Sequence, residues 1–230
     1  MEIIPAIIPH SFHDLEDYIR DVKDMASIVQ IDVLDGKHVP EKSWPYKIAR
    51  DPDFEKIKQE GEGMPFWQDV QFEVDLMIQK PEEAWRDWMH AGASRVIVHL
   101  ESTDVLSTII SEFKEENVAE DSLLCGQIGV AIQVTTDNEK LYPLLEDIDF
   151  VQCMGIEHIG YQGQEFDERV IAKIKDIKNR KPEMVVSVDG AMNEKTIPLV
   201  RDAGAERVAV GSALFESENI KKTYQHLTSL

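Results

Sequence analysis

Cysteine is scarce in this chain of 230 residues, which contains only Cys125 and Cys153. The two do not form a Cys-x-x-Cys pair, so the sequence indicates neither a disulfide framework nor a thiolate metal site. The segment Met1 to Pro5 has no basic stretch followed by a long apolar one, so no export signal is visible. We therefore expect a reduced, cytoplasmic setting.

Basic residues are also few, because 24 Lys and Arg stand against 44 Asp and Glu, giving a formal net charge of −20. This charge repels nucleic acid and anionic membrane surfaces, so we expect neither as a partner. No apolar tract approaches the roughly 18 residues that a membrane helix needs. An anionic ligand would have to be bound by a local device such as backbone amides.

Short β-branched runs alternate with longer segments of helical period along the chain. Eight runs have the length and composition of strands: Ile3 to Ile8, Ile28 to Val33, Gln71 to Met77, Arg95 to His99, Gln127 to Ile132, Phe150 to Met154, Met184 to Val188 and Arg207 to Val210. Apolar spacing predicts helices between them. The first should begin at Ser11, which forms a capping-box pattern with Asp14.

An internal echo supports a repeated βα unit. The segment AGASRV at 91–96 recurs as AGAERV at 203–208, each time where a helix should end on a glycine and a strand begin. Eight apolar strands joined by crossovers suit a parallel sheet covered by helices. An open doubly wound sheet is disfavoured, because the first strand is not followed by a Gly-rich turn. We predict an α/β fold, a single (β/α)8 TIM barrel domain over residues 1–230, with 35–53 as a candidate active-site loop.

Acids occur at three of the predicted strand ends, where barrels of this kind hold their active sites. Asp32 and Asp75 belong to the second and third runs, and Asp189 follows the seventh. Alternation places Gln30 on the same face as Asp32. A carboxylate that points into a barrel is costly unless it is paired, metal-bound or catalytic. Any one of these acids could merely cap a helix, but three converging acids favour a functional site.

Glycines follow the last three predicted strands, where barrels commonly bind phosphate. Glycine lets backbone N–H groups approach a phosphate, and a following helix N-terminus adds partial positive charge, so no lysine is required. Tight turns use glycine as well, but the clustering after successive strands favours a phosphate site. The candidate residues are Gly160, Gly163, Gln164, Gly190, Gly211 and Ser212.

Other residues near the predicted strand ends have simpler interpretations. His38, His99 and His158 could each touch a ligand, but a lone histidine is more often a structural residue, and we interpret them so. Trp85 and Trp88 stand at helical spacing and are expected to pack in the core.

Several motifs occur in the order typical of one enzyme family. They are IDVLDGKHVP at 31–40, DLMI at 75–78, VHLE at 98–101, GYQGQ at 160–164, VDG at 188–190 and GSALF at 211–215. From Pro5 to Phe215 the chain thus resembles the ribulose-phosphate 3-epimerases. The resemblance implies an isomerase that performs a metal-assisted 1,1-proton transfer at C3 of a ketose phosphate through an enediolate. Asp32 and Asp189 match its acid/base pair, and a homo-oligomer is expected.

The sequence departs from the family pattern at the metal site. The two metal-binding histidines of the family fall at Gln30 and Asp75, and the second glycine of its phosphate-binding V-D-G-G falls at Ala191. The remaining metal set is Gln30, Asp32, Asp75 and Asp189. These oxygen ligands suit Mg2+ or Mn2+ better than Zn2+, unless no metal is bound.

Two alternatives to an epimerase remain open at this point. A lyase or decarboxylase on a related phosphate-binding barrel would also pass through an enediolate, but it would need a lysine beside the acids, near Leu34. A non-catalytic sugar-phosphate-binding relative is the other alternative, and the lost histidines support it.

Overall fold

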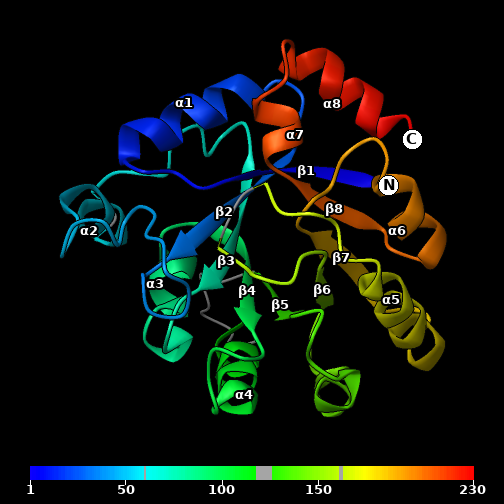
Figure 1. The fold of residues 1–230 in the computed structure, drawn as a ribbon. Coiled ribbons are helices and arrows are strands. Elements are labelled where there is room, and N and C mark those ends of the chain that lie inside the picture. The colour runs from blue at the N-terminus through cyan, green and yellow to red at the C-terminus, as the bar shows by residue number, and fades with distance from the viewer. Residues whose placement is uncertain (60, 118–125, 161–162) are drawn as a thin grey trace.

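Eight parallel strands form a closed barrel in chain order, from β1 to β8 (Figure 1). The computed structural model describes residues 1–59, 61–117, 126–160 and 163–230. The strands are β1 (Glu2–Ile7), β2 (Ile28–Leu34), β3 (Gln71–Met77), β4 (Ala93–His99), β5 (Gln127–Ile132), β6 (Phe150–Met154), β7 (Val185–Asp189) and β8 (Arg207–Val210). The predicted (β/α)8 barrel is confirmed.

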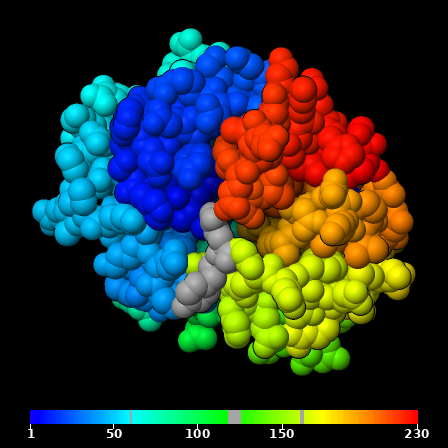
Figure 2. Space-filling model, turned by 45° about the horizontal axis from the view of Figure 1, so that its top comes forward, coloured from blue at the N-terminus to red at the C-terminus, as the bar shows by residue number. Residues whose placement is uncertain are grey.

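The barrel closes between the first and last strands. Glu2 pairs with Arg207 and Pro5 with Val210 in parallel register. In the space-filling view, the N-terminal segments (blue) accordingly lie beside the C-terminal ones (red) (Figure 2). Closure of the sheet leaves no unpaired strand edge and brings the carboxyl ends of all eight strands to one rim.

Helices cover the outside of the barrel. They are α1 (Phe12–Val22), α2 (Pro52–Lys58), α3 (Trp85–His90), α4 (Leu106–Asn117), α5 (Arg169–Arg180), α6 (Ile197–Ala203), α7 (Ser212–Phe215) and α8 (Ile220–Thr228). The expectation of a helix in every crossover is wrong after β5, where two short 3-10 helices replace an α-helix: Asn138–Lys140 and Tyr142–Leu144. Pro143 explains the difference, since a proline inside a helix removes a hydrogen bond and clashes with the preceding turn.

Local sequence signals define several helix ends. Ser11 caps α1 as predicted, because its Oγ accepts a hydrogen bond from the backbone N–H of Asp14 at 3.1 Å. Gly92 and Gly204 follow α3 and α6 with φ values of 98° and 114°. Glycine adopts this left-handed conformation without steric cost, so the echoed sequence does end two equivalent helices.

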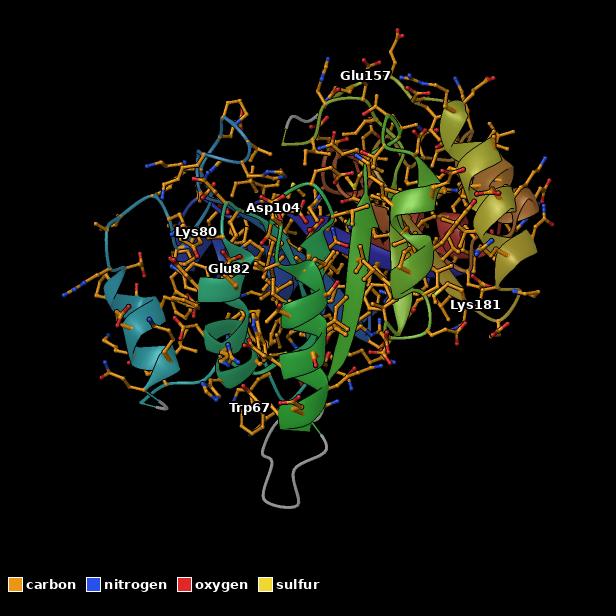
Figure 3. All side chains as sticks on the ribbon, turned by 90° about the horizontal axis from the view of Figure 1, so that it is seen from below. Trp67, Lys80, Glu82, Asp104, Glu157 and Lys181 are labelled. Carbon is orange, nitrogen blue, oxygen red and sulfur yellow. The ribbon has the colours of Figure 1, made fainter. Side chains whose placement is uncertain are left out.

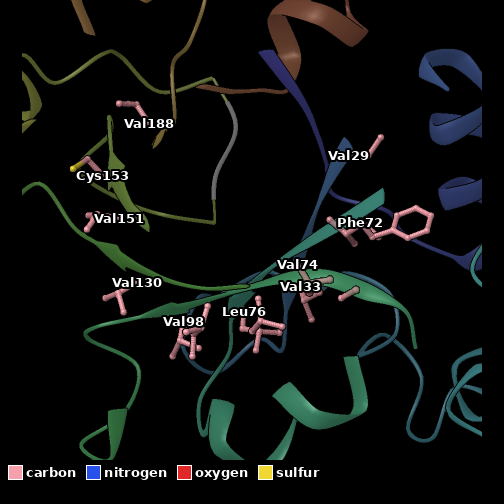
Figure 4. Packing of buried hydrophobic residues seen from close by; sticks show 14 of the residues in the cluster. Val29, Val33, Phe72, Val74, Leu76, Val98, Val130, Val151, Cys153 and Val188 are labelled. Carbon is pink, nitrogen blue, oxygen red and sulfur yellow. The ribbon is translucent and has the colours of Figure 1, made fainter. Parts of the chain in front are cut away.

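The main apolar core lies between the strands and the helices. Outward-facing residues of neighbouring strands, such as Val74 and Val98, pack there (Figure 4), and Trp85 and Trp88 are fully buried as expected. Cys153 belongs to the same layer, and burial raises the pKa of its thiol to about 12. It therefore stays protonated and inert; Cys125 lies outside the described residues. No helix in the described ranges is long and apolar enough to cross a membrane.

The barrel interior is polar at its amino-terminal end. Glu73, which is fully buried, accepts a hydrogen bond from Nη2 of Arg207, and Nη1 of Arg95 lies 3.4 Å from the same carboxylate oxygen. The Arg207 guanidinium also lies 4.5 Å from the centroid of the Phe150 ring. This cluster fills the end of the barrel opposite the rim where the strands finish.

Removing one partner of this buried cluster should be strongly destabilising. We expect Glu73→Leu to lower the free energy of unfolding by about 3–5 kcal/mol, because Arg207 would lose its buried partner and keep only the partly exposed Glu2, 3.3 Å from its Nε. Urea titration of the folded protein measures the change. The double variant Glu73→Leu/Arg207→Met should recover much of the loss. A loss under 1 kcal/mol in the single variant would contradict this account of the barrel base.

Candidate active site

A cavity of about 880 Å3 opens at the carboxyl ends of the strands. Seen from the side, this end carries Glu157, in the loop after β6, whereas Trp67, which precedes β3, lies at the other end (Figure 3). The predicted acid/base and phosphate-site residues all line the cavity: Asp32, Asp189, Gly160, Gly163, Gln164, Gly190, Ala191, Gly211 and Ser212. Strands distant in sequence thus bring the predicted site residues together.

Gln30 and Asp75, the other two proposed metal ligands, are fully buried and do not line the cavity. The Nε2 of Gln30 donates to Oδ1 of Asp32 at 2.8 Å and to Oδ2 of Asp189 at 3.1 Å. Carboxylate oxygens of Asp32, Asp75 and Asp189 lie within 4.8 Å of one another. Gln30 therefore links Asp32 to Asp189, and Asp75 completes a compact triad of acids.

Burial and mutual repulsion change the acidity of the triad. Burial first, and then the charges of Asp189 and Asp75, hold the pKa of Asp32 well above its usual range. Burial, followed by the charge of Asp75, raises the pKa of Asp189 to about 7. A carboxyl group that titrates near neutral pH can act as either acid or base.

The triad fits a divalent cation. Three buried carboxylates repel one another unless protons or a cation offset their charge. The Oε1 of Gln30 is buried and makes no hydrogen bond to the described residues, and rotation of the amide would exchange it with Nε2 beside the acids. Oxygen ligands of this kind suit hard cations such as Mg2+ and Mn2+.

Two further side chains hold Asp75 from the sides of the barrel. Nε2 of His99 lies 2.9 Å from Oδ1 of Asp75, and Nε2 of Gln152 donates to Oδ2 at 2.9 Å. All three side chains are fully buried. Gln152 was missed in the sequence, although a glutamine within the apolar run FVQCM of a predicted strand is a usable signal. His99 is not simply a core histidine, because it contacts the acid triad.

Other residues that the sequence predicts near the rim lie outside the cavity. His38 and His158 do not line the cavity, and neither does any residue of the 35–53 loop, so the expectation of an active-site loop is wrong for direct contact. The loop does border the mouth. A Cβ added to Gly160 (φ +82°) would lie 2.7 Å from Cβ of Val39, so the two loops touch closely there.

The end of the cavity where the sequence predicts a phosphate site combines left-handed backbone with a lysine. Gly190 has φ +101°, and a Cβ there would lie 2.8 Å from Ile156. Ala191 has φ 58°, and its carbonyl accepts a hydrogen bond from Oγ1 of Thr196 at 2.8 Å. Lys195 also lines the cavity. Lys195 was missed in the sequence, because backbone amides alone can bind a phosphate; its place in the loop after β7 was a usable signal.

Fold and site together define a (β/α)8 barrel that has buried carboxylates at a cavity at the carboxyl ends of its strands. The chain belongs to the ribulose-phosphate 3-epimerase family, because the model of that family matches residues 2–215. The ribulose-phosphate 3-epimerase of Bacillus subtilis is 29% identical over 99% of this chain and 98% of its own length. That of Schizosaccharomyces pombe is 27% identical over 95% of this chain and 88% of its own length.

Solved structures share the architecture at low sequence identity. KGPDC from Streptococcus mutans, in complex with D-R5P, has a TM-score of 0.71 and 13% identity, over 99% of this chain and 95% of that one. A 3-hexulose-6-phosphate synthase has a TM-score of 0.67 and 20% identity, over 100% and 99%. These similarities establish the barrel fold and carry no conclusion about the reaction.

Proposed function

We propose that this protein is an isomerase that inverts the configuration at C3 of a ketose phosphate, with Asp32 and Asp189 as the acid/base pair. The observation that carries the proposal is the placement of both acids at one cavity, on β2 and β7, with the amide of Gln30 between them. Inversion needs one group that removes a proton and another that returns one on the opposite face. Two carboxylates on strands from different parts of the barrel supply that arrangement.

The acidity of the pair supports the same chemistry. One carboxylate must be ionised to take the C3 proton while the other is protonated to deliver one. Because the pKa of Asp189 is raised to about 7 and burial holds that of Asp32 well above its usual range, the pair retains protons near neutral pH. Either direction of reaction is then open, since the two residues exchange roles when the other epimer is bound.

A divalent cation, Mg2+ or Mn2+, is the proposed cofactor. Asp32, Asp75 and Asp189 would hold it, together with Gln30 after rotation of its amide. When bound, such an ion stabilises the negative charge that develops on the enediolate oxygens. A cytoplasmic homo-oligomer stays a prediction of the sequence.

The phosphate group of the substrate is proposed to bind between the loops after β6, β7 and β8. Backbone N–H groups near Gly163, Gly190 and Gly211 would supply hydrogen bonds, and Lys195 a positive charge in a chain that is otherwise strongly acidic.

A bulky side chain at Gly211 should weaken substrate binding. A Cβ there would lie 3.3 Å from the carbonyl oxygen of Ala6, at the edge of the cavity. We expect Gly211→Val to raise the Kd of a ketose phosphate roughly 10- to 100-fold, the equivalent of one lost hydrogen bond to a charged group. Calorimetry measures this, with Gly61→Val, outside the cavity, as the control. Equal affinity in a folded Gly211→Val protein would exclude the proposed phosphate position.

The function itself is tested by proton exchange. The purified protein, supplied with Mg2+ or Mn2+, is incubated in D2O with D-ribulose 5-phosphate and other ketose phosphates and followed by NMR. An epimerase forms the second epimer and places deuterium at C3. Binding without exchange would make the protein a sugar-phosphate binder, and release of a carbon fragment would make it a lyase.

A further inference from the structure

The carboxylate of Asp75 is hydrogen-bonded to side chains from two other strands. Both of its carboxylate oxygens accept a hydrogen bond, Oδ1 from His99 and Oδ2 from Gln152, each at 2.9 Å. Asp32 and Asp189, by contrast, share the side-chain amide of Gln30, and Asp189 has a further hydrogen bond from the backbone of Gly190. The two donors of Asp75 come from β4 and β6, and neither His99 nor Gln152 lines the cavity.

Strand register explains how these donors reach one carboxylate. His99 pairs with Ala131 of β5, and Ala131 pairs with Gln152 of β6, so the three residues occupy one level of the barrel. Alanine fills little of the interior, which leaves room for the longer side chains on either side. Asp75 lies on β3, next to β4, within reach of both.

These two hydrogen bonds reduce the electrostatic cost of a buried triad of acids. In the family pattern the position of Asp75 is a neutral histidine, so this chain has one more buried negative charge beside its acid/base pair. The two N–H groups that donate to Asp75 partly offset that negative charge without taking up space in the cavity. The Nδ1 of His99 is buried and makes no hydrogen bond to the described part of the chain, so the polar contact of the ring is directed at Asp75.

We propose that His99 and Gln152 are positioning residues that fix the carboxylate of Asp75 toward Asp32 and Asp189, so that the triad binds a divalent cation without the usual histidine ligands. Each oxygen of Asp75 gives one lone pair to a donor and retains others for an ion. Groups that orient a ligand in this way typically contribute about 10- to 100-fold to metal affinity. The inference rests on the metal-assisted form of the proposed function.

The test measures Mn2+ binding by calorimetry and by the electron paramagnetic resonance signal of the bound ion. Gln152→Leu and His99→Leu each remove one donor, and both should weaken Mn2+ binding by about 10- to 100-fold. His99→Gln retains an N–H donor near the position of Nε2 and should restore most of the affinity. Ser187→Ala is the control, because Ser187 is buried at the level of Gln152 but makes no hydrogen bond to the described residues.

Thermal unfolding with a chelator present separates a lost fold from a lost site. Weakened Mn2+ binding in a Gln152→Leu protein that melts as the unaltered protein does supports the inference. Unchanged affinity in folded Gln152→Leu, or a His99→Gln protein as impaired as His99→Leu, overturns it. Absence of Mn2+ binding by the unaltered protein also overturns it, whereas the epimerase proposal has its own proton-exchange test and can succeed without the ion.

Discussion

Replacing either Asp32 or Asp189 with asparagine should lower the rate of epimerisation by roughly 10²–10⁴-fold, the usual contribution of a general acid or base. Asparagine keeps the shape of the side chain and much of its hydrogen bonding but accepts no proton. Each aspartate serves one face of C3, so the loss of either blocks inversion. The remaining aspartate can still exchange the proton on its own face, so one epimer should take up deuterium from D2O without being converted.

The measurement combines NMR detection of exchange with calorimetric binding of the same ketose phosphate. Asp202→Asn is the matched control, because Asp202 is an exposed aspartate of α6 outside the cavity. Full conversion by a folded Asp32→Asn or Asp189→Asn protein would remove that residue from the mechanism. Loss of substrate binding in either variant would place its role in binding instead.

Mn2+ binding should be strongly dependent on pH and should disappear in Asp75→Ala. An ion requires ionised carboxylates, and the pKa of Asp189 is about 7, so affinity should fall about tenfold per pH unit below 7 for each proton displaced. Removal of Asp75 takes away one of three charged ligands. We expect the unaltered protein to prefer Mn2+ or Mg2+ over Zn2+, because the site offers oxygen only.

The raised pKa of Asp189 also determines how the free energy of unfolding depends on pH. The pKa of Asp189 is raised from 3.8 in the folded protein, so protonation stabilises the fold; this contribution is complete below pH 3.8 and is lost as the pH rises through about 7. Added Mn2+ should therefore raise the melting temperature more at pH 8 than at pH 5.5. Tight binding of Zn2+, or Mn2+ affinity equal at both pH values, would contradict the oxygen-ligand site.

The strands were predictable because a parallel barrel buries both faces of each strand. The run at 71–77 matches β3 fully, since its apolar residues lie between Gln71 and the turn after Met77. The two 3-10 helices after β5 were not predictable from the spacing of apolar residues, because this spacing does not show that Pro143 interrupts the segment. Turn chemistry, more than hydrophobicity, determined that outcome.

The candidate site was predictable where a residue type and a strand end coincide, as for Asp32 and Asp189. The contacts of Asp75 were not, because they depend on the level at which β4 and β6 stand in the closed barrel. Sequence alternation places Gln152 inside the barrel but does not say which strand it faces. That information exists only in the register across Ala131.

The amide of Gln30 joins residues separated by 159 positions in the sequence, from β2 to Asp189 of β7. No hairpin, single βα unit or half-barrel contains both partners, and contacts of such long sequence separation form late and slowly in folding. The proposed Mn2+ binding would therefore probe a late stage of folding as well as the chemistry of the site. During refolding its signal should appear after the helical circular dichroism has recovered, at the time when β7 joins the sheet. A nascent chain that has not yet included β7 has no such binding centre, whatever its secondary structure.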